Sequence, residues 1–277
     1  AVPMTLGQTF GGFASILRHE IANLDYAAHQ FLAINMGATA IGTGISSEPE
    51  YAGYCTEAMA KITGWDITLT EDLVGATSDT SEMVGYSSAL RRIAIKVNKI
   101  CNDLRLLSSG PRCGLGEINL PAMQPGSSIM PGKVNPVICE AAIMVAAQVI
   151  GNDATIALSS TNGAFELNVG IPVMAANLLQ SIRLLANVSR VAAEKMIDGL
   201  SANVERCRFL AEASPSTVTP LNKLIGYEAA AKIAKYSVAN KVTVRDAVVA
   251  LGYVERGEVT EAQLDEALDV TKMLGDF

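Results

Sequence analysis

The chain has 277 residues, a net charge of −7, and 49% hydrophobic but only 5% aromatic residues. An acidic chain without a basic tract argues against nucleic acid as a partner. No run of about 18 uninterrupted apolar residues occurs, so we expect no membrane span, and the N-terminal residues predict no secretory signal. With so few aromatics, the core must be built from Ala, Val, Ile, Leu and Met, which is typical of close-packed helices.

The cysteines and histidines bear on location and on metal binding. The five cysteines are scattered and form no C-x-x-C pair, which is typical of reduced cysteines in the cytoplasm. The two histidines, His19 and His29, fall in one helical pattern. We therefore expect a cytoplasmic protein with no metal site and no bound cofactor.

Long helical patterns dominate the first part of the chain. Apolar residues recur with nearly seven-residue spacing, which predicts helices over residues 10–31, 49–63, 71–107, 137–150 and 165–196. Opposite the first apolar stripe lie polar residues that we expect on a solvated or intersubunit face: Arg18, His19, Glu20 and Asn23. Helices of roughly 30 residues would be about 45 Å long, which fits a long bundle.

One segment of this bundle is apolar on nearly every side. It follows Pro136 and continues to Ile150. A helix that is hydrophobic all round needs neighbours on all sides. Since a single chain of this size seldom supplies them, we expect a bundle to which several chains contribute.

The character of the chain changes after about residue 203. Ser-Pro and Thr-Pro pairs occur, and shorter helices are expected over residues 226–239, 243–251 and 260–268. The last of these begins with Thr260-Glu-Ala-Gln, a capping-box pattern. The sequence therefore predicts an all-α protein with a central helical-bundle domain, residues 1–205, and a small C-terminal helical domain, residues 206–277.

Residues 126–136, GSSIMPGKVNP, form a glycine- and serine-containing loop between two helical patterns. We expect Asn135 to be the N-cap of the next helix and Pro136 its first residue. The N-terminus of a helix attracts anions, because free N–H groups and the positive end of the dipole point outward there. On composition alone this segment could also be an ordinary connecting loop.

The residue types in this segment suggest a chemistry. Ser127 or Ser128 could act as nucleophile or base, Lys133 supplies positive charge, and Asn135 can hydrogen-bond a carboxylate. Glu140 lies one turn into the helix, where it could orient a histidine or lysine. A hydrolase triad is not supported, since there is no G-x-S-x-G and no nearby histidine. Such a loop suits a small dianion, for example a dicarboxylate and its aci-carboxylate intermediate.

The same residues resemble a known family. Residues 126–135 match the G-S-S-x-M-P-x-K-x-N signature of the fumarase/aspartase superfamily of lyases. Other segments resemble the family in the same order: residues 1–8, 37–44, 109–112, 165–169 and 225–227. The resemblance implies a long central bundle, a homotetramer, active sites built from three subunits, and a small dicarboxylate substrate.

The resemblance also implies roles for single residues. Ser127 resembles the base that removes a proton from the carbon next to the substrate carboxylate. Lys133 and Asn135 resemble carboxylate-binding residues. Ser128 is either a further substrate contact or a neighbour that positions the base. Glu140 resembles the acid that pairs with an active-site histidine, and its alternative role is a helix-start charge.

The sequence departs from the family at its front. Family members carry a Thr-His pair shortly before the segment that matches Ala1, and a Ser-Thr-Asn-type segment earlier. Neither pattern is present here. We therefore expect an N-terminally truncated lyase that lacks the family's N-terminal domain, and a chain that is weakly active or inactive by itself.

Two substrates fit the family chemistry. Several segments resemble aspartate ammonia-lyases: residues 76–80, 99–109, 117–121 and 136–138. Others resemble fumarases: residues 113–116, 138–140, 165–168 and 179–182. We predict that the full-length protein eliminates ammonia from L-aspartate to give fumarate. The alternatives are hydration of fumarate to L-malate and an inactive structural fragment.

Overall fold

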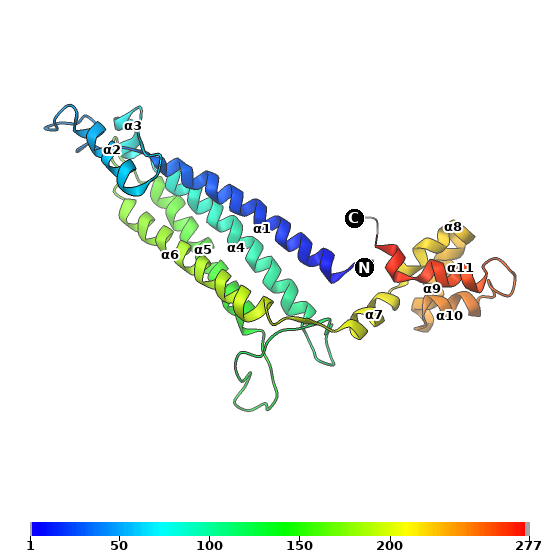
Figure 1. Cartoon of the computed structure of the whole chain (residues 1–277). Coiled ribbons are helices and arrows are strands. Elements are labelled where there is room, and N and C mark those ends of the chain that lie inside the picture. The colour runs from blue at the N-terminus through cyan, green and yellow to red at the C-terminus, as the bar shows by residue number, and fades with distance from the viewer. Residues whose placement is uncertain (1, 275–277) are drawn as a thin grey trace. The chain divides into compact units, whose positions relative to one another are not determined.

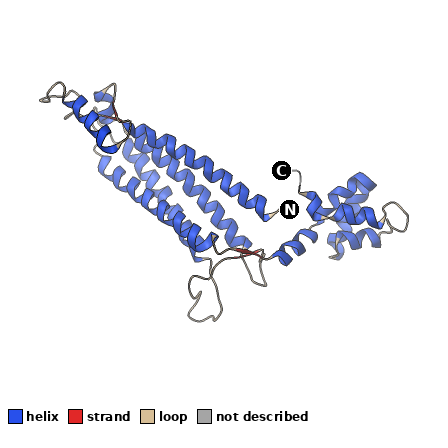
Figure 2. Cartoon of the chain, viewed as in Figure 1, coloured by secondary structure: helices blue, strands red, loops and turns tan. Residues whose placement is uncertain are grey.

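The structure is a computed structural model that describes residues 2–274. Its regular structure is mainly helical (Figure 2). The strands have two residues each: β1 (Ala33–Ile34), β2 (Thr68–Leu69), β3 (Ile118–Asn119) and β4 (Ser201–Ala202). β1 pairs with β2 in parallel, and β3 pairs with β4 antiparallel. The prediction of an all-α protein is therefore confirmed.

The described residues divide into two compact units, which we treat separately. One unit comprises Ala14–Leu106 and Leu120–Leu200. The other comprises Leu107–Asn119 and the described parts of Ala1–Phe13 and Ser201–Phe277. The predicted boundary between residues 205 and 206 stays a prediction.

The first of these units is a bundle of long helices that run side by side (Figure 1). They are α1 (Leu6–His29, in this unit from Ala14), α4 (Ser81–Leu107), α5 (Val137–Ser160) and α6 (Ile171–Ala192). α6 continues as one π-helical turn, η2 (Ala193–Ile197). Shorter elements lie beyond one end of the bundle: η1 (Gln30–Leu32), α2 (Tyr51–Thr63) and α3 (Leu73–Ser78).

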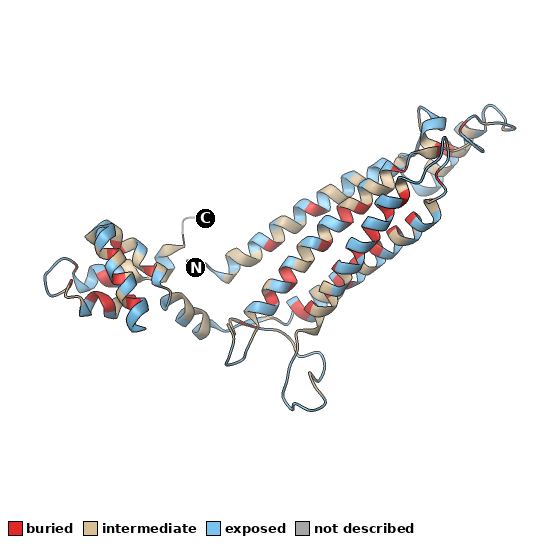
Figure 3. Ribbon diagram, turned by 180° about the vertical axis from the view of Figure 1, so that it is seen from behind, coloured by how far each residue is buried: buried red, intermediate tan, exposed pale blue. Residues whose placement is uncertain are grey.

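The core of the bundle is a cluster of buried residues from α4, α5 and α6. Figure 3 shows buried positions recurring along the long helices of the bundle. Small and branched side chains let these helices approach closely. The buried apolar set is Leu90, Ala94, Ala146, Val149, Ile156, Met174, Leu178 and Leu185. α5 also leaves large apolar side chains uncovered within the chain, since Met144 and Leu158 are each 67% exposed.

Three predicted helix boundaries were wrong. The helix expected over residues 71–107 is interrupted after Ser78, because Asp79 is extended and its carboxylate accepts from the N–H of Ser81, where α4 begins. The helix expected from residue 165 begins at Ile171. Before it, Asn168 turns the chain by donating to the carbonyls of Ser159 and Ser160 and accepting from the N–H of Gly170. α5 extends past Ile150 to Ser160.

Buried polar groups cross the bundle at the middle of α5. Asp153 is buried and forms an ion pair with Arg91 at 2.9 Å, and it accepts a hydrogen bond from Ser87 at 2.7 Å. By length and composition alone, Val137–Ser160 and Ile171–Ile197 could each cross a membrane. Core helices pass the same test, and the paired carboxylate in mid-helix is a feature of a packed bundle.

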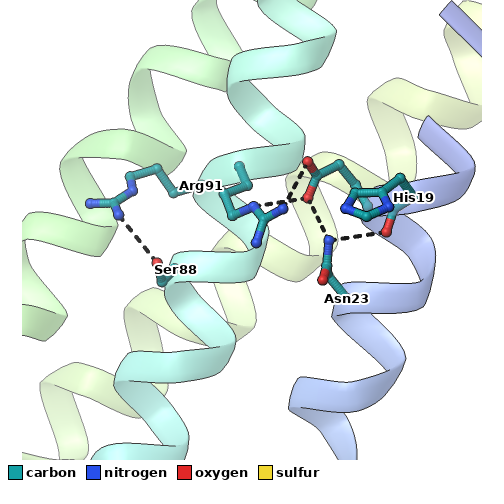
Figure 4. Close-up of polar contacts among 6 residues, drawn as sticks. His19, Asn23, Ser88 and Arg91 are labelled. Atoms are coloured by element: carbon teal, nitrogen blue, oxygen red, sulfur yellow. Dashed lines mark hydrogen bonds and ion pairs between the residues drawn. The ribbon is translucent and has the colours of Figure 1, made fainter. Parts of the chain in front are cut away.

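Glu20 corrects an expectation about α1. It was predicted on a solvated or intersubunit face, but it is buried against α4. Its carboxylate accepts two contacts from the guanidinium of Arg92, at 3.0 and 3.2 Å, and a longer one from Asn23. The amide of Asn23 also donates to the carbonyl of His19 (Figure 4). A buried carboxylate is tolerated at this position because the positive charge of Arg92 on the neighbouring helix pairs with it.

The other unit holds the C-terminal helices. They are α7 (Val204–Glu212), η3 (Pro215–Leu221), α8 (Asn222–Ile225), α9 (Tyr227–Asn240), α10 (Val244–Ala250), α11 (Glu261–Leu268) and η4 (Val270–Met273). Their buried core is formed by Leu221, Ile233, Val244, Ala247, Val248, Tyr253, Val259 and Leu264. The predicted capping box of Thr260 is confirmed, and Thr243 forms another.

Candidate active site in the glycine-serine loop

Residues 120–136 form a loop whose neck is closed by hydrogen bonds between its own residues. The N–H of Gly126 donates to the carbonyl of Lys133 at 2.9 Å, and Asn135 Nδ2 donates to the carbonyl of Gly126 at 3.2 Å. A Cβ at position 126 would lie 2.2 Å from the carbonyl oxygen of Lys133. Only glycine therefore allows the two arms of the loop to approach this closely.

Ser127 lies just beyond this neck and is half-buried. Its Oγ accepts hydrogen bonds from the N–H groups of Ile129 and Met130, each at 3.2 Å. A hydroxyl that accepts from the chain two and three residues ahead is a serine turn, formed by local sequence alone. Two N–H dipoles aimed at one oxygen favour its anionic form, so this arrangement would stabilise an alkoxide at Ser127.

The loop surrounds an open hollow of about 470 Å³. It is lined by residues 122–127 and 130–134, so the structure brings Ser127 and Lys133 to one cavity. Ser128, Asn135 and Glu140 are not among the lining residues. Of the predicted site residues, Ser128 and Lys133 are exposed, whereas Ser127, Asn135 and Glu140 are half-buried.

The start of α5 differs from the prediction. Asn135 is not its N-cap: Pro136 holds that position, α5 begins at Val137, and no side chain caps the helix. The amide of Asn135 is instead directed back to the loop neck, where it donates to Gly126. Glu140 lies in the first turn of α5. The N–H groups at the start of α5 are thus left free of a side-chain cap, which suits an anionic ligand.

Two features of the site escaped the sequence analysis. Gln124 lines the hollow and offers an amide there. The N–H groups of Ile129 and Met130 converge on Ser127, although neither side chain suggests a role. The position of Gln124 next to Pro125 in the signature loop could have indicated its role. Serine often accepts hydrogen bonds from nearby N–H groups, and this preference could have indicated the donors to Ser127.

A buried pair of thiols lies beneath the start of α5. Cys139, which precedes Glu140, contacts Cys101 of α4, and both are buried. The hydrogen bond with Cys139 and burial raise the pKa of Cys101, so Cys101 stays a neutral thiol. Among residues 2–274, no group of three or more His, Cys, Asp or Glu side chains is placed to hold a metal ion.

Comparison with known protein families decides what kind of protein carries this loop. Residues 1–151 match the family model described as Lyase, and residues 218–275 match the model described as Fumarase C C-terminus. The first match covers more than half of the chain. The chain belongs to the fumarase/aspartase superfamily of lyases. The resemblance predicted from the loop signature is confirmed at this level.

Relatives within the superfamily include two activities. A class II fumarate hydratase of Corynebacterium efficiens is 48% identical over 99% of this chain. An aspartate ammonia-lyase of Pseudomonas canavaninivorans is 47% identical, also over 99%. A crystal structure described as fumarate lyase:delta crystallin from Brucella melitensis bound to cobalt is 47% identical over 100% of the chain, with a TM-score of 0.94. The chain spans 58% of the length of this fumarate hydratase and 57% of the length of this aspartate ammonia-lyase.

Proposed function

We propose that the whole protein is a lyase that forms fumarate from a four-carbon dicarboxylate, with Ser127 as the general base. One observation carries this proposal: two backbone N–H groups converge on Ser127 Oγ within the superfamily's signature loop. Serine is a poor base unless its alkoxide is stabilised, and these donors supply that stabilisation before substrate arrives.

The proposed elimination has two steps. The alkoxide of Ser127 takes a proton from the carbon next to one substrate carboxylate, and the electron pair moves into that carboxylate as an aci-carboxylate. The pair then returns to form the carbon–carbon double bond as the bond from the neighbouring carbon to the leaving group breaks. The ammonium group of aspartate leaves directly as ammonia, whereas the hydroxyl of malate must take a proton from a general acid to leave as water. Lys133 lies at the same hollow and would hold the growing negative charge, and Asn135 and Ser128 are proposed as further carboxylate contacts.

Glu140 is proposed as the partner of an active-site histidine. Glu140 lies in the first turn of α5, so its alternative role is that of a helix-start charge. In that role its negative charge would only stabilise the helix by interacting with the positive end of the helix dipole. A pH profile separates the two roles. If Glu140 holds a histidine, Glu140→Gln shifts the pH dependence of kcat/KM, whereas loss of a helix-start charge lowers stability and leaves that profile in place.

The leaving group is the finer question. The sequence segments favour ammonia, and the ammonia-lyase remains our prediction. The relatives do not separate the two activities, because fumarate hydratase and aspartate ammonia-lyase match this chain at 48% and 47% identity. Both substrates therefore belong in the first experiment.

The test uses the full-length protein with L-aspartate and, separately, with L-malate, and follows fumarate by its ultraviolet absorbance. Turnover of aspartate supports the ammonia-lyase, and turnover of malate alone favours the hydratase. If neither substrate gives fumarate, the proposal is overturned in favour of another superfamily substrate or a structural role. The 277-residue chain is assayed in parallel, and we expect it to be weakly active or inactive.

We also propose that the protein is a homotetramer whose active sites are shared between subunits. The uncovered apolar side chains of α5, Met144 and Leu158, support assembly through the bundle, because burying them would remove large apolar surfaces from water. The mass of the full-length protein by light scattering tests this directly.

A further inference from the structure

The loop that carries Ser127 is held at both ends by one short segment. Residues 120–136 have no regular secondary structure, and loops of this length without their own structure are uncommon and usually functional. Such a loop can aim a base only if its ends are fixed. Both ends contact the same element, the turn that follows α6.

This element is the π-turn segment, residues 193–199, which comprises η2, Asp198 and Gly199. Its wide turn is closed by the N–H of Asp198, which donates to the carbonyl of Ala193 at 3.0 Å. A π-turn adds one residue to the helical repeat, so the side chains that follow it point in new directions. In proteins such turns occur often at functional sites.

One contact fixes the C-terminal end of the loop. Met196, buried within the π-turn, accepts a hydrogen bond from Cys139 Sγ at 3.2 Å, sulfur to sulfur. Cys139 is fully buried in the first turn of α5, one residue before Glu140. The contact therefore fixes the position of the first turn of α5 relative to the π-turn segment.

A second contact fixes the N-terminal end. A Cβ built on Gly199 would lie 2.6 Å from Cγ of Pro121, too close for any ordinary contact. The φ of Gly199 is not in the left-handed region, so the backbone itself would accept alanine there. Glycine is needed at this position for space, because Pro121 rests directly on it.

We propose that Met196 and Gly199 are positioning residues, which act through Cys139 and Pro121 to aim the loop bearing Ser127. This inference rests on the proposed function for its effect on catalysis. Its structural part, that the π-turn segment determines the order of the loop, stands independently. A displaced base loses rate steeply, since about 1 Å of misplacement can cost 10²-fold.

The first test is Gly199→Ala in the full-length protein. The new Cβ must push Pro121 away, so we expect kcat to fall by roughly 10- to 100-fold. KM should rise as well, because the proposed carboxylate contacts Lys133 and Asn135 lie in the same loop. Adding Pro121→Ala removes Cγ and Cδ of the ring and leaves only Cβ, which lies 3.5 Å from the new methyl group, an ordinary contact. The double variant should therefore recover most of the lost kcat. Pro121→Ala alone removes the ring that rests on Gly199 and should lower kcat, by less than Gly199→Ala does.

The matched control is Gly53→Ala in α2, where a new Cβ would meet no atom within 4 Å. Hydrogen exchange of the N–H groups of Ile129 and Met130 gives a second readout, which needs no activity. Gly199→Ala should speed their exchange and the double variant should slow it again. Unchanged kcat and exchange in Gly199→Ala, or failure of the double variant to recover either, would overturn the proposal.

Met196 provides a second variant if Gly199→Ala does not fold. Met196→Ala opens space beneath Cys139 and should speed the same exchange and lower kcat. Met196→Leu keeps most of the volume but lacks the accepting sulfur, so its effects should be smaller than those of Met196→Ala. If Met196→Ala changes neither the hydrogen exchange nor kcat, the proposed role of Met196 is wrong. If the wild-type protein forms no fumarate while the exchange responds as expected, the proposed function fails and the positioning of the loop stands.

Discussion

The glycine-serine loop and the bundle core differ in how far their side chains are buried and in what holds them in place. In the loop, apolar side chains face outward: Ile129 is 83% and Val134 57% exposed. The hydrogen bonds we trace there join residues at most nine positions apart. In the bundle core, Ile156 of α5 is fully buried among side chains of three helices. The loop thus presents the candidate catalytic groups but buries little apolar surface. The core buries apolar surface and contains none of the candidate catalytic groups.

This difference has an energetic consequence. Removing a group from the loop should change turnover and leave the free energy of unfolding nearly unchanged. Removing one from the core should do the reverse, because the cost is the loss of buried apolar contacts and the cavity that remains. Variants that affect both properties would show that the two regions are coupled.

The largest expected effect is at Ser127. We expect Ser127→Ala in the full-length protein to lower kcat by about 10²- to 10⁴-fold, the usual contribution of a general base. The melting temperature should fall only slightly, because the residue is half-buried and the hydrogen bonds lost are local to the loop. Ser128→Ala is the matched control and should cost much less if Ser128 only contacts substrate or positions its neighbour. Equal losses at both serines would contradict the assignment of the base.

The next effect concerns the uncovered face of the bundle. Leu158→Asp places a charge on α5 where the proposed tetramer would bury it, and a buried unpaired charge is strongly unfavourable. We expect the full-length protein to shift to smaller species in light scattering. Ile62→Asp in α2, at a residue that is 84% exposed, is the control. An unchanged mass for Leu158→Asp would exclude this face from the assembly.

Within the core, Ile156→Ala should destabilise the protein by about 2–5 kcal/mol, the range for deleting a buried Ile side chain. Chemical denaturation measures this change. At a temperature where the variant remains folded, its kcat should stay close to wild type, because the loop is separate from this part of the core. A loss of kcat comparable to that of Ser127→Ala would show that core packing controls the loop.

The sequence was most informative where local physics decides the structure. The apolar spacing predicted α1, α4 and α6, and the pattern starting at Thr260 predicted a capping box that the structure contains. Glu140 was predicted one turn into its helix, and it lies there. In each case the residues that determine the outcome lie within a few turns of one another.

Sequence reasoning failed where a distant partner decides. Glu20 is buried because Arg92, far along the chain, pairs with it. Asn135 looked like an N-cap, but the loop neck offers it the carbonyl of Gly126 instead. The space that requires glycine at position 199 exists only because Pro121 packs there. No local pattern contains these partners, so only the folded chain could reveal them.

The smallest expected effect lies in the C-terminal helices, which form a core of their own. Thr260 caps α11: its Oγ1 accepts from the N–H of Gln263 at 3.2 Å, and the side chain of Gln263 accepts from the N–H of Thr260 at 3.0 Å. Thr260→Ala should cost about 1 kcal/mol, the usual value of an N-cap, measured by chemical denaturation. Thr260→Ser keeps the capping oxygen and should retain most of this stability. Because this cap lies in a different unit from the loop, kcat should not change in either variant, and a change in kcat would link the C-terminal helices to turnover.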